Sequence, residues 1–230
     1  PYLSRLWANG DRREFAETLE WSMRIALLIA VPAAAGLIIL AAPLVITLFH
    51  GGAFDARSVA MTVLALQAYA LGLGGFSFVK VLAPAFFARE DTRTPVRIGI
   101  AALLVNLVLG ASSAWYLSSS GFSGPHVALA AATSVAAILN AVLLYVGLRK
   151  ADAIRHGPGW GMLLMRVALA NGAMILTLMQ LQKAATWWLA ASLSQRVVWL
   201  GVSVVAGAGI YFIVLLALGL RPSQLRMRHD

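Results

Sequence analysis

Six long apolar stretches, separated by short polar loops, account for most of the chain. Each stretch is long enough to cross a hydrocarbon core of about 30 Å as an α-helix. Proline occurs within the two longest stretches, at Pro32, Pro43 and Pro84, where it predicts tilted or kinked helices. The six stretches are residues 23–49, 59–87, 96–117, 127–148, 161–181 and 197–220.

The composition favours membrane spans over a soluble core. Hydrophobic residues make up 60% of the chain and charged residues 12%, whereas a soluble domain has roughly 25% charged residues. The mean hydropathy is +0.82. A buried soluble helix is the alternative for any single stretch, but six in succession favour the bilayer. We therefore predict an all-α polytopic membrane protein with six transmembrane helices.

Basic residues alternate between the two sides of the predicted spans. The opposite loops carry only Arg57, Lys183 and Arg196. Since positively charged loops stay in the cytoplasm, both ends of the chain are predicted to be cytoplasmic. The net charge of +9 fits this topology together with anionic lipid, and its dispersal over several loops argues against a nucleic-acid partner. The richer side carries Arg5, Arg12, Arg13, Arg89, Arg93, Arg97, Arg149, Lys150, Arg155, Arg221, Arg226 and Arg228.

Residues suited to helix capping lie beside three of the stretches. Asp11 with Glu14 predicts a capping box, followed by an interfacial segment, 15–21, whose Glu17 and Glu20 face water. Asp55 is suited to cap the second span, after an outer loop with Gly51 and Gly52. Thr94 followed by Pro95 is suited to begin the third span.

The loops and their flanking residues resemble the C-terminal part of the MurJ/MviN family of lipid II flippases, in the multidrug/oligosaccharidyl-lipid/polysaccharide exporter superfamily. The most specific match is the run of residues 80–84 with the polar positions that follow it. The resemblance covers essentially the whole chain and weakens after Arg149. The matching residues are Pro1-Tyr2-Leu3-Ser4, Pro32, Gly36, Leu48-Phe49, Gly52, Phe54, Lys80-Val81-Leu82-Ala83-Pro84, Phe86, Ala88, Asp91, Thr94, Pro95 and Gly157-Pro158-Gly159-Trp160.

The resemblance implies helices nine to fourteen of a fourteen-helix fold built from two lobes around a central cavity. Because the chain begins at Pro1 without an initiator Met, we expect it to be the C-terminal part of a larger protein. The implied organisation is a cytoplasmic connection and interfacial segment (1–22), four helices of the second lobe (23–148), a cytoplasmic linker (149–160), two extra helices that form a groove for the lipid tail (161–220), and a cytoplasmic tail (221–230).

The function implied by the resemblance is transport rather than catalysis. Members flip the undecaprenyl-pyrophosphate-linked peptidoglycan precursor, lipid II, from the inner to the outer leaflet of the bacterial inner membrane by alternating access. The expected partners are this precursor, membrane lipids and the N-terminal helices of the same protein. The best-known cavity arginines of the family lie mainly upstream of the matched region, so they have no counterparts to assign here.

Lys80 is the first of four candidate substrate-binding residues. It is the only Lys or Arg well inside a span, about two turns from the cytoplasmic end. On a helix it shares a face with Ser77 and Pro84. It can hold a phosphate in the cavity or close an inner gate; alternatively, it snorkels to the interface or pairs with carbonyls freed by Pro84.

The other three candidates are Arg24, Arg166 and Asn106. Arg24 lies at the start of the first span, where snorkelling is the alternative role. Arg166 can meet a lipid phosphate at the groove entrance or anchor the interface. Asn106, like the other intramembrane amides, can line the cavity or hydrogen-bond between helices. These other amides are Gln67, Asn140 and Asn171.

Small residues inside the spans predict close helix packing, at Ser203 with Gly207 and at a cluster of three glycines. The clustered glycines can alternatively form a hinge. They are Gly72, Gly74 and Gly75.

The acidic residues predict neither a carboxylate relay nor a metal centre, since all nine lie in loops or at span ends. The four histidines are widely separated, at positions 50, 126, 156 and 229, and no nucleotide-binding motif occurs. We therefore predict no cofactor. The acidic residues are Asp11, Glu14, Glu17, Glu20, Asp55, Glu90, Asp91, Asp152 and Asp230.

Two alternative functions remain open. An ion-coupled drug or polysaccharide exporter would share the architecture, and intramembrane acids in the upstream half would favour it. A membrane-embedded lipid-linked glycosyltransferase would need catalytic carboxylates at a membrane face. Only Asp91 and Glu90 are candidates for that role, and their place beside Thr94 and Pro95 makes helix capping and pairing within the loop the better account.

Overall fold

Among the described residues, six helices are long and apolar enough to cross a membrane. The computed structural model describes residues 2–49, 55–119, 125–154, 157 and 159–220. The expectations for the loop glycines 51 and 52 and for the cytoplasmic tail, 221–230, fall outside these residues. The elements are α1 (Tyr2–Ala8), α2 (Arg12–Ile39), α3 (Ala41–Phe49), α4 (Ala56–Ala88), α5 (Arg93–Ser119), α6 (Pro125–Lys150), α7 (Trp160–Leu181), α8 (Ala185–Ala190) and α9 (Leu193–Ala217). The spanning helices are α2, α4, α5, α6, α7 and α9, which confirms the predicted number of spans.

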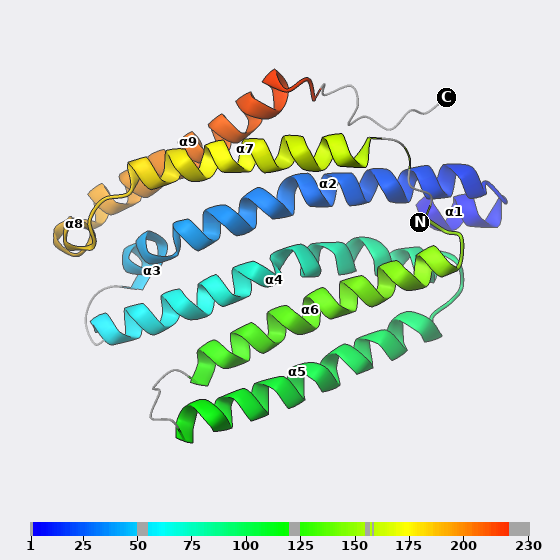
Figure 1. Cartoon of the computed structure of the whole chain (residues 1–230), viewed down its shortest axis with the longest axis horizontal. Coiled ribbons are helices and arrows are strands. Elements are labelled where there is room, and N and C mark those ends of the chain that lie inside the picture. The colour runs from blue at the N-terminus through cyan, green and yellow to red at the C-terminus, as the bar shows by residue number, and fades with distance from the viewer. Residues whose placement is uncertain (1, 50–54, 120–124, 155–156, 158, 221–230) are drawn as a thin grey trace.

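The spanning helices lie side by side in the order α5, α6, α4, α2, α7 and α9 (Figure 1). The short helix α1 packs against α2 and α4, and α3 packs against α4, α8 and α9. Connections alternate between two ends of the row. One end, hereafter the basic end, contains α1, the α4–α5 connection, the end of α6 and the start of α7 (Figure 1). The opposite end contains α8 and the start of α4.

The charged residues follow this alternation. Among the described residues, the basic end carries Arg5, Arg12, Arg13, Arg89, Arg93, Arg97, Arg149 and Lys150, and the opposite end carries Arg57, Lys183 and Arg196. Positive charge is therefore concentrated at the basic end of the row, as expected for a protein that is oriented by its basic loops.

The first apolar stretch differs from its prediction at its start and in its interior, and it ends at Phe49 as predicted. Helix α2 begins at Arg12, so the expected interfacial segment and the first span form one continuous helix. The helix then stops at Ile39, and a second helix, α3, resumes at Ala41. Pro43 explains the break, because it has no N–H to donate to the carbonyl of Ile39. The side-chain amide of Gln182 supplies the missing donor, since its Nε2 donates to the carbonyl of Ile39 at 2.7 Å.

A second proline leaves a carbonyl that another helix satisfies. Pro32, inside α2, cannot donate to the carbonyl of Leu28 one turn earlier. The hydroxyl of Tyr211, from α9, donates to this carbonyl at 2.9 Å, and its side chain is buried. Backbone groups inside a bilayer need such internal partners because no water replaces them. Tyr211 therefore joins α9 to α2 at the position where α2 lacks a hydrogen bond.

Replacing Tyr211 with phenylalanine is expected to lower the stability of the fold by about 1–3 kcal/mol, since the buried Leu28 carbonyl loses its donor. In a Pro32→Ala background the loss should be at least halved, because residue 32 regains an N–H for this carbonyl. Thermal unfolding in detergent of the four proteins in this double-mutant cycle measures the coupling. An identical cost of Tyr211→Phe in both backgrounds would rule out the proline as the reason for the contact.

Two glycines bring α4 and α6 into direct contact. A Cβ added to Gly75 would lie 2.7 Å from the backbone of Ala137 and Ile138, and one added to Gly72 would lie 2.7 Å from Cα of Ser134. Ser134 in turn donates to the carbonyl of Ala68 at 2.6 Å. A Cβ on Gly74 would meet nothing within 4 Å. Packing thus explains Gly72 and Gly75, and Gly74 lies outside the helix contact.

The helix caps differ from expectation at two of three positions. Asp55 caps α4 as predicted, accepting from the Ser58 N–H at 2.8 Å. The side chain of Asp11 makes no capping hydrogen bond to α2. Glu14 instead accepts from the hydroxyl of Tyr2 at 2.6 Å, so the predicted capping box is wrong. Helix α5 begins at Arg93, ahead of the predicted start.

Asp91 replaces Thr94 as the residue that caps α5. Its carboxylate accepts from the Thr94 N–H at 3.0 Å. The hydrogen bonds to Thr94 lower the pKa of Asp91, because they favour the ionised carboxylate. This residue of the α4–α5 connection therefore has a structural role at the basic end.

Candidate functional site

An apolar groove of about 340 Å³ lies between α2, α7 and α9. Three of its lining side chains, Ile29, Val204 and Phe212, are 62%, 49% and 59% exposed, so the groove opens away from the protein. Its hydroxyl groups are both used internally: Ser203 donates to the carbonyl of Trp199 and Tyr211 to that of Leu28. The groove is therefore suited to hydrocarbon rather than to a polar ligand.

Small residues create this groove. Helix α2 contributes Ala33 and Gly36 next to Pro32, and α9 contributes Gly207 and Ala208. A Cβ on Gly207 would lie 3.0 Å from Cδ2 of Leu178, so α9 and α7 touch at this point. The groove thus runs along the contact of α7 and α9, the pair at which the family resemblance implies a lipid-tail groove, and it uses α2 as its third wall.

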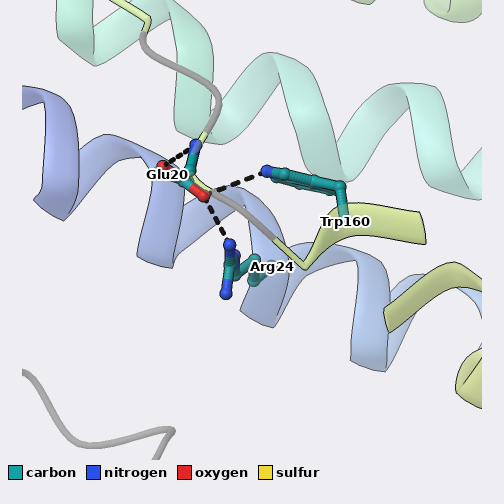
Figure 2. Close-up of polar contacts among 4 residues, drawn as sticks. Glu20, Arg24 and Trp160 are labelled. Atoms are coloured by element: carbon teal, nitrogen blue, oxygen red, sulfur yellow. Dashed lines mark hydrogen bonds and ion pairs between the residues drawn. The ribbon is translucent and has the colours of Figure 1, made fainter. Parts of the chain in front are cut away.

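Glu20 fixes α7 against α2 at the basic end (Figure 2). Its carboxylate accepts from Nη2 of Arg24 at 2.5 Å, from Nε1 of Trp160 at 3.0 Å and from the N–H of Gly157 at 3.0 Å. The Glu20 side chain is only 12% exposed. The expectation that Glu20 faces water is therefore wrong, whereas Glu17, at 62% exposure, does face solvent.

The same junction explains part of the sequence before α7. A Cβ on Gly157 would lie 2.8 Å from Oε1 of Glu20, so any side chain there would displace the carboxylate. Gly159 has a φ of +102°, which glycine adopts at little cost. Both glycines belong to the Gly157-Pro158-Gly159-Trp160 run. Sequence alone showed these residues as a motif but not the acid that they surround.

The two candidate arginines occupy different places at the basic end. Arg24 is held by Glu20, and its guanidinium carbon lies 5.5 Å from the ring centre of Trp160. Arg166, on α7, extends towards the end of α9, where a Cβ on Gly219 would lie 3.6 Å from its Nη2. Its Nε is buried and has no hydrogen-bond partner in the described part of the chain. Arg166 lies about two turns of α7 from Met174 in the groove.

The remaining two candidates lie on the other side of α2. Lys80 on α4 is exposed. Asn106 on α5 accepts from the hydroxyl of Thr133 on α6 at 3.3 Å. Gln67 likewise donates to the carbonyl of Ile38 at 3.0 Å. Asn106 and Gln67 thus take part in the hydrogen bonding between helices expected of intramembrane amides.

Carboxylates and histidines form no candidate metal centre within the described residues. Asp91 is committed to the α5 cap, and Glu90, with a φ of 61°, occupies the turn before it. This arrangement supports a structural role for both residues of the α4–α5 connection.

In the described part of the chain, a row of six helices that are long and apolar enough to cross a membrane, with an exposed apolar groove and positive charge gathered at one end, defines a polytopic membrane protein. The sequence identifies its family. Residues 1–198 match the family model described as lipid II flippase MurJ. The chain therefore belongs to the lipid II flippase MurJ family and is a multi-pass protein of the inner membrane.

Individual relatives agree with this assignment. The probable lipid II flippase MurJ of Vibrio cholerae is 37% identical over 98% of this chain, and the match covers 42% of the relative. The lipid II flippase MurJ of Burkholderia cenocepacia is 34% identical over 99% of this chain, covering 43% of the relative. The chain thus spans about two fifths of the length of these curated relatives, and the predicted match to their C-terminal part is confirmed.

A solved structure shows the same fold. It is described as lipid II flippase MurJ in an inward closed conformation, and it matches 92% of this chain with a TM-score of 0.69 and 22% sequence identity. The match covers 40% of that chain. The predicted all-α architecture, with six spans that form part of a longer fold, is therefore confirmed.

Proposed function

We propose that this chain forms part of a transporter that flips lipid II from the inner to the outer leaflet by alternating access. Its membership of the family carries this proposal, and the lipid-facing groove between α2, α7 and α9 supports it. The precursor combines a long apolar tail with an anionic head group. Only the head group needs a polar path through the membrane, because the tail is stable in hydrocarbon.

The groove is the proposed seat of the undecaprenyl tail. Its apolar lining and its opening towards the bilayer allow a tail to enter sideways without desolvating a polar group. In this proposal residues 23–148 belong to the second lobe and residues 161–220 form the groove, with α2 of the second lobe as its third wall. The tail remains in the groove while the head group crosses through the cavity between the lobes.

A polar substitution inside the groove is expected to weaken retention of the lipid tail. Ala208→Gln places an amide among apolar lining residues, and its desolvation should lower affinity for an undecaprenyl lipid about tenfold. Val205→Gln is the matched control, since Val205 on the same helix is 73% exposed and lies outside the groove. Binding of a fluorescent undecaprenyl phosphate to the purified proteins gives both values. Equal affinities of the two variants would exclude the groove as the tail site.

The proposed orientation places the basic end in the cytoplasm. This end carries most of the Lys and Arg residues of the described chain, and such residues are retained on the cytoplasmic side. Residues 1–22 and 149–160 would then face the cytoplasm, together with the tail at 221–230 and both ends of the chain.

Contacts with the head group are proposed for Lys80, Arg24, Arg166 and Asn106. Lys80 is the strongest of the four, because it lies on the spanning helix α4 and its side chain is exposed. Arg166 is suited to a phosphate at the groove end of α7, whereas Arg24 would act from the Glu20 junction and Asn106 from the α5–α6 contact.

Replacing Lys80 with glutamine is expected to reduce transport at least tenfold, whereas Lys80→Arg should retain most of it, because an intramembrane cation stabilises the anionic head group. Transport is measured as labelled lipid II that becomes accessible at the outer face. Lys183→Gln, at the opposite end, is the charge-matched control. Equal transport by the wild-type protein, Lys80→Gln and Lys80→Arg would show that the positive charge at this position is dispensable.

A fusion tests the proposed function. In this fusion, the chain replaces the C-terminal portion of the Vibrio cholerae relative. This portion is the matched 42% of that protein. We expect the fusion to restore growth to cells depleted of their own flippase. Insertion of the fusion at normal abundance without any rescue would contradict the proposal.

The acid-poor spans disfavour the exporter alternative, since the acidic residues of the described chain lie in connections or near helix ends. The glycosyltransferase alternative lacks a free carboxylate at Asp91, which caps α5. We infer that the chain has a transport function rather than an enzymatic one.

A further inference from the structure

Two arginines flank one indole ring at the basic end. The guanidinium carbon of Arg12 lies 3.0 Å from the ring centre of Trp7, and that of Arg89 lies 4.8 Å from it. The three residues come from separate elements: Trp7 from α1, Arg12 from the first turn of α2, and Arg89 from the C-cap of α4. The fold therefore brings together two positive charges that are far apart in the sequence.

Neither guanidinium group forms an ion pair with a carboxylate among the described residues. The ion pairs in the described part of the chain involve Arg13 with Glu17 and Arg24 with Glu20. Asp91, whose charge acts on Arg89, accepts a hydrogen bond from the Thr94 N–H instead of forming an ion pair. The Nε of Arg89 is buried without a hydrogen-bond partner among the described residues. Burial lowers the pKa of Arg89, whereas the charge of Asp91 raises it. The charge of Arg12 also lowers this pKa, because the two guanidinium groups are close enough to repel one another.

The cluster is built into the packed core. Leu6, next to Trp7, is buried in the same apolar cluster as Phe15 and Phe86. The Trp7 ring packs edge-on against Phe15, with ring centres 5.3 Å apart. The backbone N–H of Arg89 donates to the carbonyl of Phe86 at 3.0 Å. Both arginines are attached to elements that this core fixes, so their backbones are held on either side of Trp7.

We propose that Arg12, Arg89 and Trp7 form a site for the phosphate of an anionic phospholipid head group. A phosphate between two guanidinium groups would relieve their repulsion and accept charge-assisted hydrogen bonds. A lipid is favoured over a soluble phosphate because α4 ends at Ala88, directly before Arg89, so the site lies where the hydrocarbon-spanning segment ends. Tryptophan is also typical of the head-group layer. This proposal does not rest on the proposed transport function.

The test measures retention of phosphatidylglycerol and of phosphatidylcholine by the full chain, carried in the fusion described above, using native mass spectrometry in detergent. We expect the wild-type protein to retain phosphatidylglycerol in preference to phosphatidylcholine. The double variant Arg12→Gln/Arg89→Gln should lose about tenfold in apparent affinity for phosphatidylglycerol. Arg12→Lys/Arg89→Lys should lose less, because it keeps both charges but not the planar guanidinium groups.

Arg13→Gln is the matched control. It removes the same charge one residue from Arg12, at a side chain that is 88% exposed and paired with Glu17. Its phosphatidylglycerol affinity should stay within twofold of wild type. Equal loss in Arg13→Gln and in the double variant would show that only the overall charge matters and would overturn the site.

Two results with the wild-type protein would also overturn the proposal, even if the double variant did not fold. Equal retention of the two lipids would show that the site does not select an anionic head group. Complete displacement of phosphatidylglycerol by millimolar inorganic phosphate would assign the site to a soluble phosphate instead of a lipid.

Discussion

Replacing Gly75 with valine is expected to disrupt the packing of α4 against α6 and to lower the stability of the fold by about 3 kcal/mol or more. A Cβ at this position would lie 2.7 Å from backbone atoms of Ala137 and Ile138. Backbone atoms cannot rotate away as a side-chain tip can, so the two helices must separate. Thermal unfolding in detergent, followed by loss of the monodisperse peak in size-exclusion chromatography, measures the effect.

Gly74→Val is the control for this prediction. It makes the same substitution one residue away, where an added Cβ meets nothing within 4 Å. Its unfolding temperature should stay close to that of the wild type, since the helix context is the same. If the two variants are destabilised equally, the cost comes from the loss of glycine within α4 and not from the contact with α6.

Replacing Glu20 with alanine is expected to detach the start of α7 from α2. Three donors lose their acceptor: Arg24, Trp160 and the N–H of Gly157. The expected cost is about 2 kcal/mol, a value that allows for the 33% exposure of the Arg24 side chain. Amide hydrogen exchange should become faster in the first turns of α7 while α4 and α6 remain protected.

Glu17→Ala provides the comparison, because it removes an acid from the same helix whose ion pair with Arg13 is exposed. Exposed pairs contribute about 0–1 kcal/mol, so this variant should behave like the wild type. Faster exchange throughout all six spans in Glu20→Ala would contradict a local role for the junction.

The number of spans and the alternation of charge could be predicted from sequence because both depend on local composition. An apolar run long enough to cross the bilayer has few alternatives to a helix. Pro43 also predicted a disturbed helix near Leu40, although a proline predicts a kink and a full break equally well. Asp55 was predictable as a cap for the same local reason.

The tertiary partners could not be predicted in this way. Glu20 lies in a polar, helical segment typical of a water-facing surface, and its acceptor role depends on Gly157 and Trp160, more than 130 residues later. The contact of Tyr211 with Leu28 spans 183 residues. The signal that was available is Pro32, which shows that the Leu28 carbonyl lacks a local donor but not which residue replaces it.

The candidate site likewise combines a feature that could be predicted before the fold was known with contacts that only the fold shows. The family resemblance placed a groove for the lipid tail at the last two helices, whereas the contribution of Pro32, Ala33 and Gly36 on α2 became evident only in the fold. The cluster of Arg12 and Arg89 around Trp7 likewise joins three segments that have no shared sequence pattern.

The most direct test of the proposed function is the translocation of lipid II by the fusion that carries this chain. Cells depleted of their own flippase are supplied with the fusion, and lipid II exposed at the outer face is measured by cleavage with an externally added enzyme. The proposed function predicts that cleavable lipid II returns to at least half of its level before depletion. Lipid II that remains inaccessible, in cells where the fusion is inserted at normal abundance, would contradict it.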